Sequence, residues 1–412
     1  MESTIENNNN LEPSTQKRFH ELDTLRAIMM QLGIVLHAAT FYMITPVKGF
    51  QGLHDPESLF LFDIIKSLIT LFRMPLFFLI SGFFGALLFK RKGFSFMVKN
   101  RLNRIALPFT VFLPLTYPIL RISFHLIINP QSSGANDTES VLSLLWPPRV
   151  YHLWFLYYLI AFYIAAISLN LIYCKLFSSS TQLKLNNLFL FFSENTTGHM
   201  AIPIAITTGL NIFWALVDAP LAFKTSSYYF TTFLLGWVLY KNQKTLYQLT
   251  SFPWDKVAVG TTSFFIFLAV SYHDSNSFPY ILVQELTAAI ATWNMLWGIL
   301  GLFQRYLSSP SKAGRYFSDA SYWIYLIHYP IVALLSLSLL HVQIGAVLKF
   351  IIVVSVTALS TLVSYHCFVR STFIGQFLNG RKFPKEEFPI SYHPKSRNNT
   401  KDSESPSQHK LA

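Results

Sequence analysis

The stretch SLFLFDIIKSLITLFRMPLFFLISGFFGALLF, residues 58–89, decides the fold class of this chain. It is rich in Leu, Ile and Phe, and its charged residues Asp63, Lys66 and Arg73 are widely spaced. A helix of this length is about 48 Å long at a rise of ~1.5 Å per residue, which exceeds the ~30 Å hydrocarbon core of a bilayer. We therefore predict a membrane helix that tilts, extends beyond the bilayer or bends near Pro75.

The whole chain has the composition of a membrane protein. Hydrophobic residues make up 52% of it and charged residues 13%, whereas a soluble domain carries about 25% charged residues. The sequence therefore predicts an all-α, polytopic integral membrane protein with about ten transmembrane helices. The predicted spans are residues 22–44, 58–89, 105–128, 151–173, 200–217, 227–240, 257–272, 280–303, 318–340 and 345–369. We expect residues 18–370 to form the membrane domain, and the polar tails 1–17 and 371–412 to be mostly disordered.

The distribution of basic residues predicts the orientation. The net charge of +12 would fit a nucleic-acid-binding protein, but the basic residues lie in short segments between apolar spans. The loops after even-numbered spans and the C-terminal tail are rich in Lys and Arg, whereas the opposite loops hold only Lys48, Arg149 and Lys224. This asymmetry predicts that both termini are cytoplasmic. No nucleic-acid partner is expected.

The connection at residues 90–104 holds six basic residues and no acidic residue. Phe and Met residues interleave with these charges, which indicates an amphipathic segment on the cytoplasmic membrane surface. One interpretation is a topology anchor that touches anionic lipid. The other is a positive rim that attracts a phosphorylated cofactor. The cysteines Cys174 and Cys367 have no metal-binding spacing, so neither a disulfide framework nor a metal site is expected.

The first predicted span carries Asp23, Arg26 and His37, and ionisable groups inside a membrane helix are costly enough to be functional hypotheses. Asp23 is spaced to pair with Arg26 on one helix face. Arg26 and His37 are eleven residues apart, so they project from nearly the same face with a rise of about 16 Å. Arg26 then lies near the cytoplasmic entrance, where it suits phosphate groups, and His37 lies deep enough to serve as a buried acid or base. The alternative is a snorkelling arginine and a packed histidine.

Other polar residues in the spans have functional and structural interpretations. We expect Asp63 and Lys66 to lie at a solvated end of their span, whereas Arg73 lies deeper. The pair Ser81-Gly82 is typical of close helix packing. Further candidates for substrate binding or support of the site are His152, Glu285 and His328. For His328 the alternative is a hydrogen-bonded core residue.

Segments in four parts of the chain resemble, in order, the motifs of membrane acyltransferase family 3. The resemblance covers residues 18–370, and the motif-like segments are Arg26-x10-His37, the stretch 73–84 (RMPLFFLISGFF), Arg101-x-x-Arg104 with Pro108, and the stretch 321–328 (SYWIYLIH). The stretches 152–156 (HLWFL) and 85–88 (GALL) look most like the glucan-modifying branch of the family.

The resemblance implies an O-acyltransferase of the bacterial inner membrane that passes an acyl group from acyl-coenzyme A to a hydroxyl of a cell-envelope glucan or polysaccharide. It implies that His37 is the catalytic base or acyl-handling residue and that Arg26 orients the donor. Asp23, Arg73, Arg101 and Arg104 become candidates for donor binding or support. Acetyl-coenzyme A and succinyl-coenzyme A both remain possible donors, and a succinyl carboxylate would need a further cation.

Two other functions fit the same features. A transporter or flippase of a lipid-linked or acylated sugar would also use buried charges in ten spans. A sensor or scaffold would retain the fold without the chemistry. The sequence makes no prediction of the oligomeric state.

Overall fold

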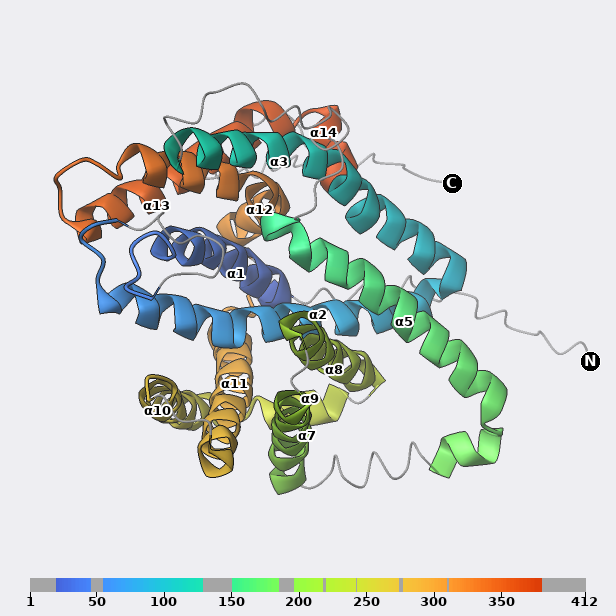
Figure 1. Cartoon of the computed structure of the whole chain (residues 1–412). Coiled ribbons are helices and arrows are strands. Elements are labelled where there is room, and N and C mark those ends of the chain that lie inside the picture. Colours follow the sequence, from blue (N-terminus) through green and yellow to red (C-terminus); the bar gives the residue numbers. More distant parts are fainter. Residues whose placement is uncertain are drawn as a thin grey trace, which may run out of the picture.

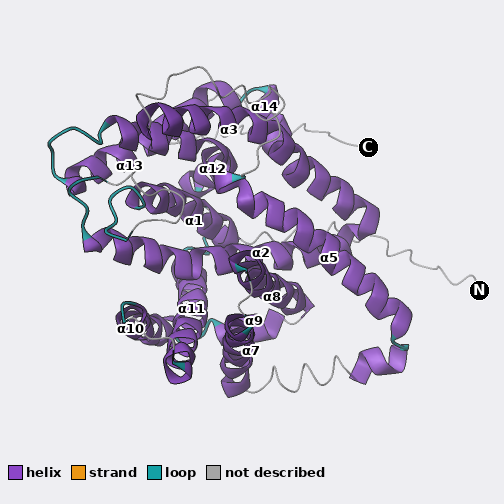
Figure 2. Cartoon of the chain, in the orientation of Figure 1, coloured by secondary structure: helices purple, strands orange, loops and turns teal. Residues whose placement is uncertain are grey.

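The computed structural model describes residues 20–45, 55–128, 150–184, 196–217, 220–241, 243–273, 277–309 and 311–379. Within these ranges the chain is helical and contains no strand (Figure 2). The principal helices are α1 (His20–Ala39), α2 (Phe60–Arg101), α3 (Leu107–Ile128), α5 (Trp154–Leu176), α7 (Thr196–Leu216), α8 (Leu221–Lys241), α10 (Pro253–Ser271), α11 (Phe278–Tyr306), α12 (Lys312–Ser338) and α13 (Ala346–Ser364). Short helices are α9 (Gln243–Leu249) and α14 (Phe373–Asn379).

Helix α2 divides the bundle into two groups (Figure 1). On one side α1 packs against α2, α12 and α13, and α3 packs against α12. On the other side α8 and α11 pack against α2, and α7 and α10 pack against α11. Because α2 touches both groups, its buried face stretches from Phe62 to Met97.

The membrane character of the fold agrees with the sequence. Six helical segments of the described chain are long and apolar enough to cross a membrane, and the apolar helix Met200–Leu216 is shorter. Each of the ten predicted spans coincides with a helix or part of one. Ten crossings and two cytoplasmic termini remain predictions. The N-terminal tail and residues 380–412 lie outside the described residues, so their disorder also stays a prediction.

The connection predicted at residues 90–104 is helical. Helix α2 continues to Arg101, and its only non-helical backbone angles are at Gly93, where φ is +79°. Glycine adopts this left-handed conformation without steric cost because it lacks a Cβ atom. A π-helical turn at Leu102–Ala106 follows, and α3 then runs back across the molecule (Figure 1). The long helix therefore breaks at Gly93 and keeps helical angles at Pro75.

Two glycines bring α2 and α8 into close contact. A Cβ atom added to Gly82 would collide with the backbone carbonyl of Phe233, and one added to Gly236 would collide with that of Leu79. The expectation that the Ser81-Gly82 pair is a close packing site is confirmed. Small residues allow such approach in membrane bundles, where packing drives helix association.

The N-terminal end of α2 carries a buried charge. Asp63 is 1% exposed, and its carboxylate accepts hydrogen bonds from the backbone N–H groups of Ile44 and Thr45 at 2.9 and 3.1 Å. The expectation of a solvated Asp63 is therefore wrong, because the chain after α1 folds over this residue and its backbone donors satisfy the carboxylate. Nearby in sequence, Asp55 forms a buried ion pair with Lys349 of α13.

Candidate functional site

Helix α1 carries the two residues that the sequence singled out. Arg26 and His37 lie within one regular helix, so the predicted rise of about 16 Å between them holds. Arg26 and Asp23 line a large cavity of about 730 Å³. His37 lines a second, smaller cavity of about 90 Å³.

The large cavity is basic. Arg91 and Arg101 of α2 and Arg104 of the π-helical turn line it together with Arg26. Segments far apart in the sequence complete the wall, because Asp319 and Tyr322 of α12 and Asn379 of α14 also line it. Arginines suit phosphate groups, since a guanidinium offers a planar fork of N–H donors.

Arg101 and Arg104 are held by different contacts. The guanidinium of Arg101 lies 5.0 Å from the centre of the Tyr163 ring, and the Tyr163 hydroxyl donates to the Ser81 carbonyl at 2.7 Å. Arg104 donates to the carbonyl of Asn379 at 3.1 Å, and its own carbonyl accepts from the Tyr322 hydroxyl at 2.8 Å. These contacts fix the wall of the large cavity to α5, α12 and α14.

The small cavity gathers residues from six helical elements, which are α1, α2, the 3₁₀ turn Tyr151–Leu153, α5, α8 and α12. His37 comes from α1, Arg73 from α2, His152 from the 3₁₀ turn Tyr151–Leu153, and Tyr325 from α12. The ring centre of His37 lies 5.2 Å from that of His328, which in turn lies 5.4 Å from that of His152. The structure therefore brings together three predicted histidines and Arg73, although they are spread over most of the chain.

The two cavities are neighbours. Met30, Phe77 and Phe155 line both of them, so these side chains form a shared wall between the basic cavity and the small cavity of His37. Arg26 and Met30 are one helical turn apart on α1, which places them on the same face of the helix. Residues of α1, α2 and α5 therefore adjoin both the cavity with the four arginines and the cavity with His37.

The hydrogen bonds of two histidines define their tautomers. His328 Nδ1 lies 2.8 Å from the Tyr325 carbonyl and 3.0 Å from the Ile324 carbonyl, and His152 Nε2 lies 3.1 Å from the Leu326 carbonyl. A carbonyl only accepts, so each of these nitrogens carries the proton. The other nitrogen of each ring, His328 Nε2 and His152 Nδ1, is buried and has no hydrogen-bond partner among the residues that the structure describes. In the neutral rings both are acceptors.

Arg73 is placed by contacts that cross from α2 to α1. Its side chain is 5% exposed, and Nε donates to the Met29 carbonyl at 2.7 Å. A Cβ atom added to Gly33 would lie 2.5 Å from Nη2 of Arg73 and 3.5 Å from Nε2 of His328. The missing side chain at Gly33 therefore makes the space that the guanidinium occupies.

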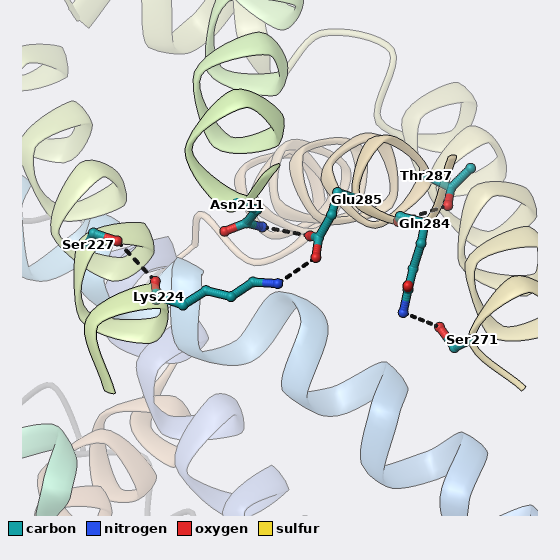
Figure 3. Close-up of polar contacts among 7 residues, drawn as sticks. All are labelled: Asn211, Lys224, Ser227, Ser271, Gln284, Glu285 and Thr287. Atoms are coloured by element: carbon teal, nitrogen blue, oxygen red, sulfur yellow. Dashed lines mark hydrogen bonds and ion pairs between the residues drawn. The ribbon is translucent and has the colours of Figure 1, made fainter. Parts of the chain in front are cut away.

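Glu285 belongs to a different part of the molecule. Its carboxylate pairs with Lys224 at 2.5 Å and accepts from the Asn211 amide at 2.9 Å, which joins α11 to α8 and α7 (Figure 3). The residue lines neither cavity. Its placement favours a role in packing these three helices.

The wall also holds residues that the sequence did not single out for function. Arg91 entered only as one of the six basic residues at 90–104, for which a positive rim that attracts a phosphorylated cofactor was one interpretation. In the small cavity, Tyr325 was not singled out either, and its hydroxyl donates to the His152 carbonyl at 2.8 Å. Nothing in the sequence pointed to Asn379 as a functional residue, because it lies in the stretch that was predicted to be a polar, mostly disordered tail. No group of three or more His, Cys, Asp or Glu residues in the described part of the chain is arranged to hold a metal ion.

Comparison with known proteins assigns the chain to a family. The acyltransferase 3 family, described as an acyltransferase domain, matches residues 19–368. The chain belongs to this family. Acyltransferase 3 relatives include glucans biosynthesis protein C of Salmonella typhi, 25% identical over 334 residues that cover 76% of this chain and 82% of the relative. The protein of the same name from Escherichia coli strain K12 is 24% identical over 337 residues, which cover 78% and 84%. No solved structure matches.

Membership of acyltransferase family 3 confirms the resemblance read from the motifs. The Arg26-x10-His37 segment, the stretch 73–84 and the stretch 321–328 all lie within the matched region. These same segments line the two cavities or contact the residues that do. The family and the relatives together indicate an enzyme, a membrane acyltransferase.

Proposed function

We propose that this protein is an O-acyltransferase of the bacterial inner membrane that transfers an acyl group from acyl-coenzyme A to a hydroxyl of a cell-envelope glucan. Its chain crosses the membrane ten times and keeps both termini in the cytoplasm. The names of the relatives support a glucan acceptor. The bilayer is the second partner, and the enzyme needs no metal ion.

The observation that carries the proposal is that the two cavities share part of their lining. Coenzyme A is polyanionic at one end and has a long, thin arm that ends in the thioester. The four arginines of the large cavity suit the phosphates. In this proposal the arm passes between Met30, Phe77 and Phe155, which line both cavities, and the acyl group enters the small cavity. At about 30 Å³ for a water-sized group, a cavity of about 90 Å³ fits a short acyl chain.

The acceptor approaches from the other side of the small cavity. His152 and Trp154 line the cavity there, at the start of α5, which the charge pattern places at the outer face. Donor and acceptor then meet at His37 from opposite sides of the membrane. This arrangement would acylate a glucan outside the cytoplasm with a cytoplasmic donor.

The chemistry needs one base at this meeting point. His37 takes the proton of the acceptor hydroxyl as its oxygen attacks the thioester carbonyl carbon. The new C–O bond forms, the C–S bond breaks with its electron pair on sulfur, and His37 returns the proton to the thiolate. The products are an acyl ester and free coenzyme A.

The decisive experiment measures transfer of a labelled acyl group by the purified protein in detergent. Acetyl-coenzyme A and succinyl-coenzyme A are offered separately with a glucan oligosaccharide. Wild type should form a labelled ester with at least one donor, and His37→Ala should lower the rate by about 10²–10⁴-fold, the usual contribution of a general base. His341→Ala is the matched control, because this histidine is exposed outside both cavities.

Two results would contradict the proposal. If His37→Ala transferred the acyl group at the wild-type rate, His37 would not be the base. If wild type formed no ester but moved a lipid-linked or acylated sugar across vesicle membranes, the protein would be the transporter that the sequence also allowed.

A further inference from the structure

Arg73 is a buried cation without an anionic partner among the described residues. Among the described residues it contacts the Met29 carbonyl and the Met74 sulfur, at 2.7 and 3.7 Å, and the nearby Phe77 ring. Buried or half-buried ion pairs such as Lys224–Glu285 and Lys349–Asp55 lie elsewhere in the molecule. Burying a charge costs several kcal/mol unless other groups compensate it, so an unpaired guanidinium here indicates a function that needs its charge.

The guanidinium faces the reacting centre. Arg73 lines the same small cavity as His37, and its Nη2 lies over Gly33, four residues before His37 on α1. Among the described residues that line this cavity, Arg73 carries the only permanent charge. Its N–H groups beyond Nε remain available for a ligand, apart from the weak contact with sulfur.

Three of the neighbouring polar groups are already committed to backbone partners. The Thr70 hydroxyl donates to the Lys66 carbonyl at 2.7 Å, and the Tyr325 hydroxyl donates to the His152 carbonyl at 2.8 Å. The protonated nitrogen of His152 faces the Leu326 carbonyl, which leaves Nδ1 as an acceptor. None of these three groups can donate to a developing negative charge without losing its backbone partner.

We propose that Arg73 is a catalytic residue that stabilises the oxyanion formed on the thioester carbonyl during acyl transfer. This inference rests on the proposed function. As the acceptor oxygen bonds to the carbonyl carbon, the carbonyl π electron pair moves onto its oxygen, and the Arg73 N–H groups donate to that oxygen. When the C–S bond breaks, the pair returns to rebuild the carbonyl.

Gly33 and His328 act as positioning residues for Arg73. Gly33 provides the space for the guanidinium, and the lone pair of His328 Nε2 faces the same space. Because that nitrogen accepts and does not donate, it favours a guanidinium beside it and does not compete for the oxyanion.

The test separates kcat from KM in the purified enzyme with each donor. Arg73→Gln should lower kcat by about 10²–10³-fold, as loss of an oxyanion donor does, and leave the affinity for free coenzyme A unchanged. Gly33→Ala keeps the arginine but displaces it, and a shift of about 1 Å is enough to cost about 10²-fold. Arg73→Lys should recover part of the loss, because it restores the charge. Lys66→Gln is the matched control, a cation on the same helix that lines neither cavity.

The outcomes distinguish this inference from the proposed function. If wild type transfers the acyl group and Arg73→Gln keeps kcat within threefold, the inference fails while the proposed function stands. If Arg73→Gln slows transfer from succinyl-coenzyme A but not from acetyl-coenzyme A, Arg73 binds the carboxylate of the succinyl group and the inference is overturned. If wild type transfers nothing, the proposed function itself fails.

Discussion

The ion pair between Asp55 and Lys349 makes the most quantitative prediction about stability. The two charges lie 2.6 Å apart, with side chains 1% and 2% exposed. Asp55 precedes α2 and Lys349 lies on α13, so the pair joins the segment before α2 to α13. We predict that Lys349→Met destabilises the protein strongly.

The structure gives the size of the effect. Removing Lys349 leaves a buried carboxylate that, among the described residues, still accepts a hydrogen bond from the Glu57 backbone N–H at 3.0 Å. Breaking a buried pair in this way costs about 3–5 kcal/mol, because one charge stays buried without its partner. Removing both charges with Asp55→Asn and Lys349→Met should restore much of the stability, and the double-mutant cycle isolates the pairwise energy.

The assay is equilibrium unfolding in mixed micelles, followed by tryptophan fluorescence. Lys224→Met is the matched control, because it breaks a pair of similar length whose side chains are 30% and 13% exposed. More exposed pairs contribute about 0–1 kcal/mol, so the control should cost far less. Equal losses in the two variants, or no recovery in the double variant, would refute the reasoning that burial sets the energy of the pair.

Three further predictions follow from the packing and the cavities. Gly82→Ala should destabilise the α2–α8 contact by about 1–3 kcal/mol in the same unfolding assay, whereas Gly209→Ala, where an added Cβ atom meets open space, should not. Arg91→Ala should raise the KM for the donor about twofold to fivefold, more at low salt than at high salt, and Lys90→Ala, outside the cavity lining, should leave it unchanged. Glu285→Gln should leave kcat and KM within twofold of wild type, since Glu285 lines neither cavity, and a larger loss of activity would contradict its assignment to packing.

The sequence predicted the helices well because membrane helices depend on local hydrophobicity and length. Each predicted span coincides with a helix, from α1 to α13. The amphipathic segment at residues 90–104 stays a prediction as to its place on the membrane surface, and the structure adds that its backbone is helical on both sides of Gly93. The prediction that Asp63 lies at a solvated helix end was wrong. A carboxylate near the start of a helix looks the same in the sequence whether its hydrogen bonds come from water or from the folded backbone.

The sequence alone could predict how Arg26 and His37 lie relative to each other, because both are on one helix and the helix repeat fixes the direction of each side chain. The sequence by itself therefore determined the membrane class, the helices and the family, which depend on local patterns and ordered motifs. Only the tertiary structure decided that His152, His328 and Arg73 meet His37, that Glu285 does not, and that the arginine cavity shares part of its lining with the cavity of His37. These contacts join residues as far apart as α1 and α12, and nothing in the spacing along a chain specifies which helices become neighbours.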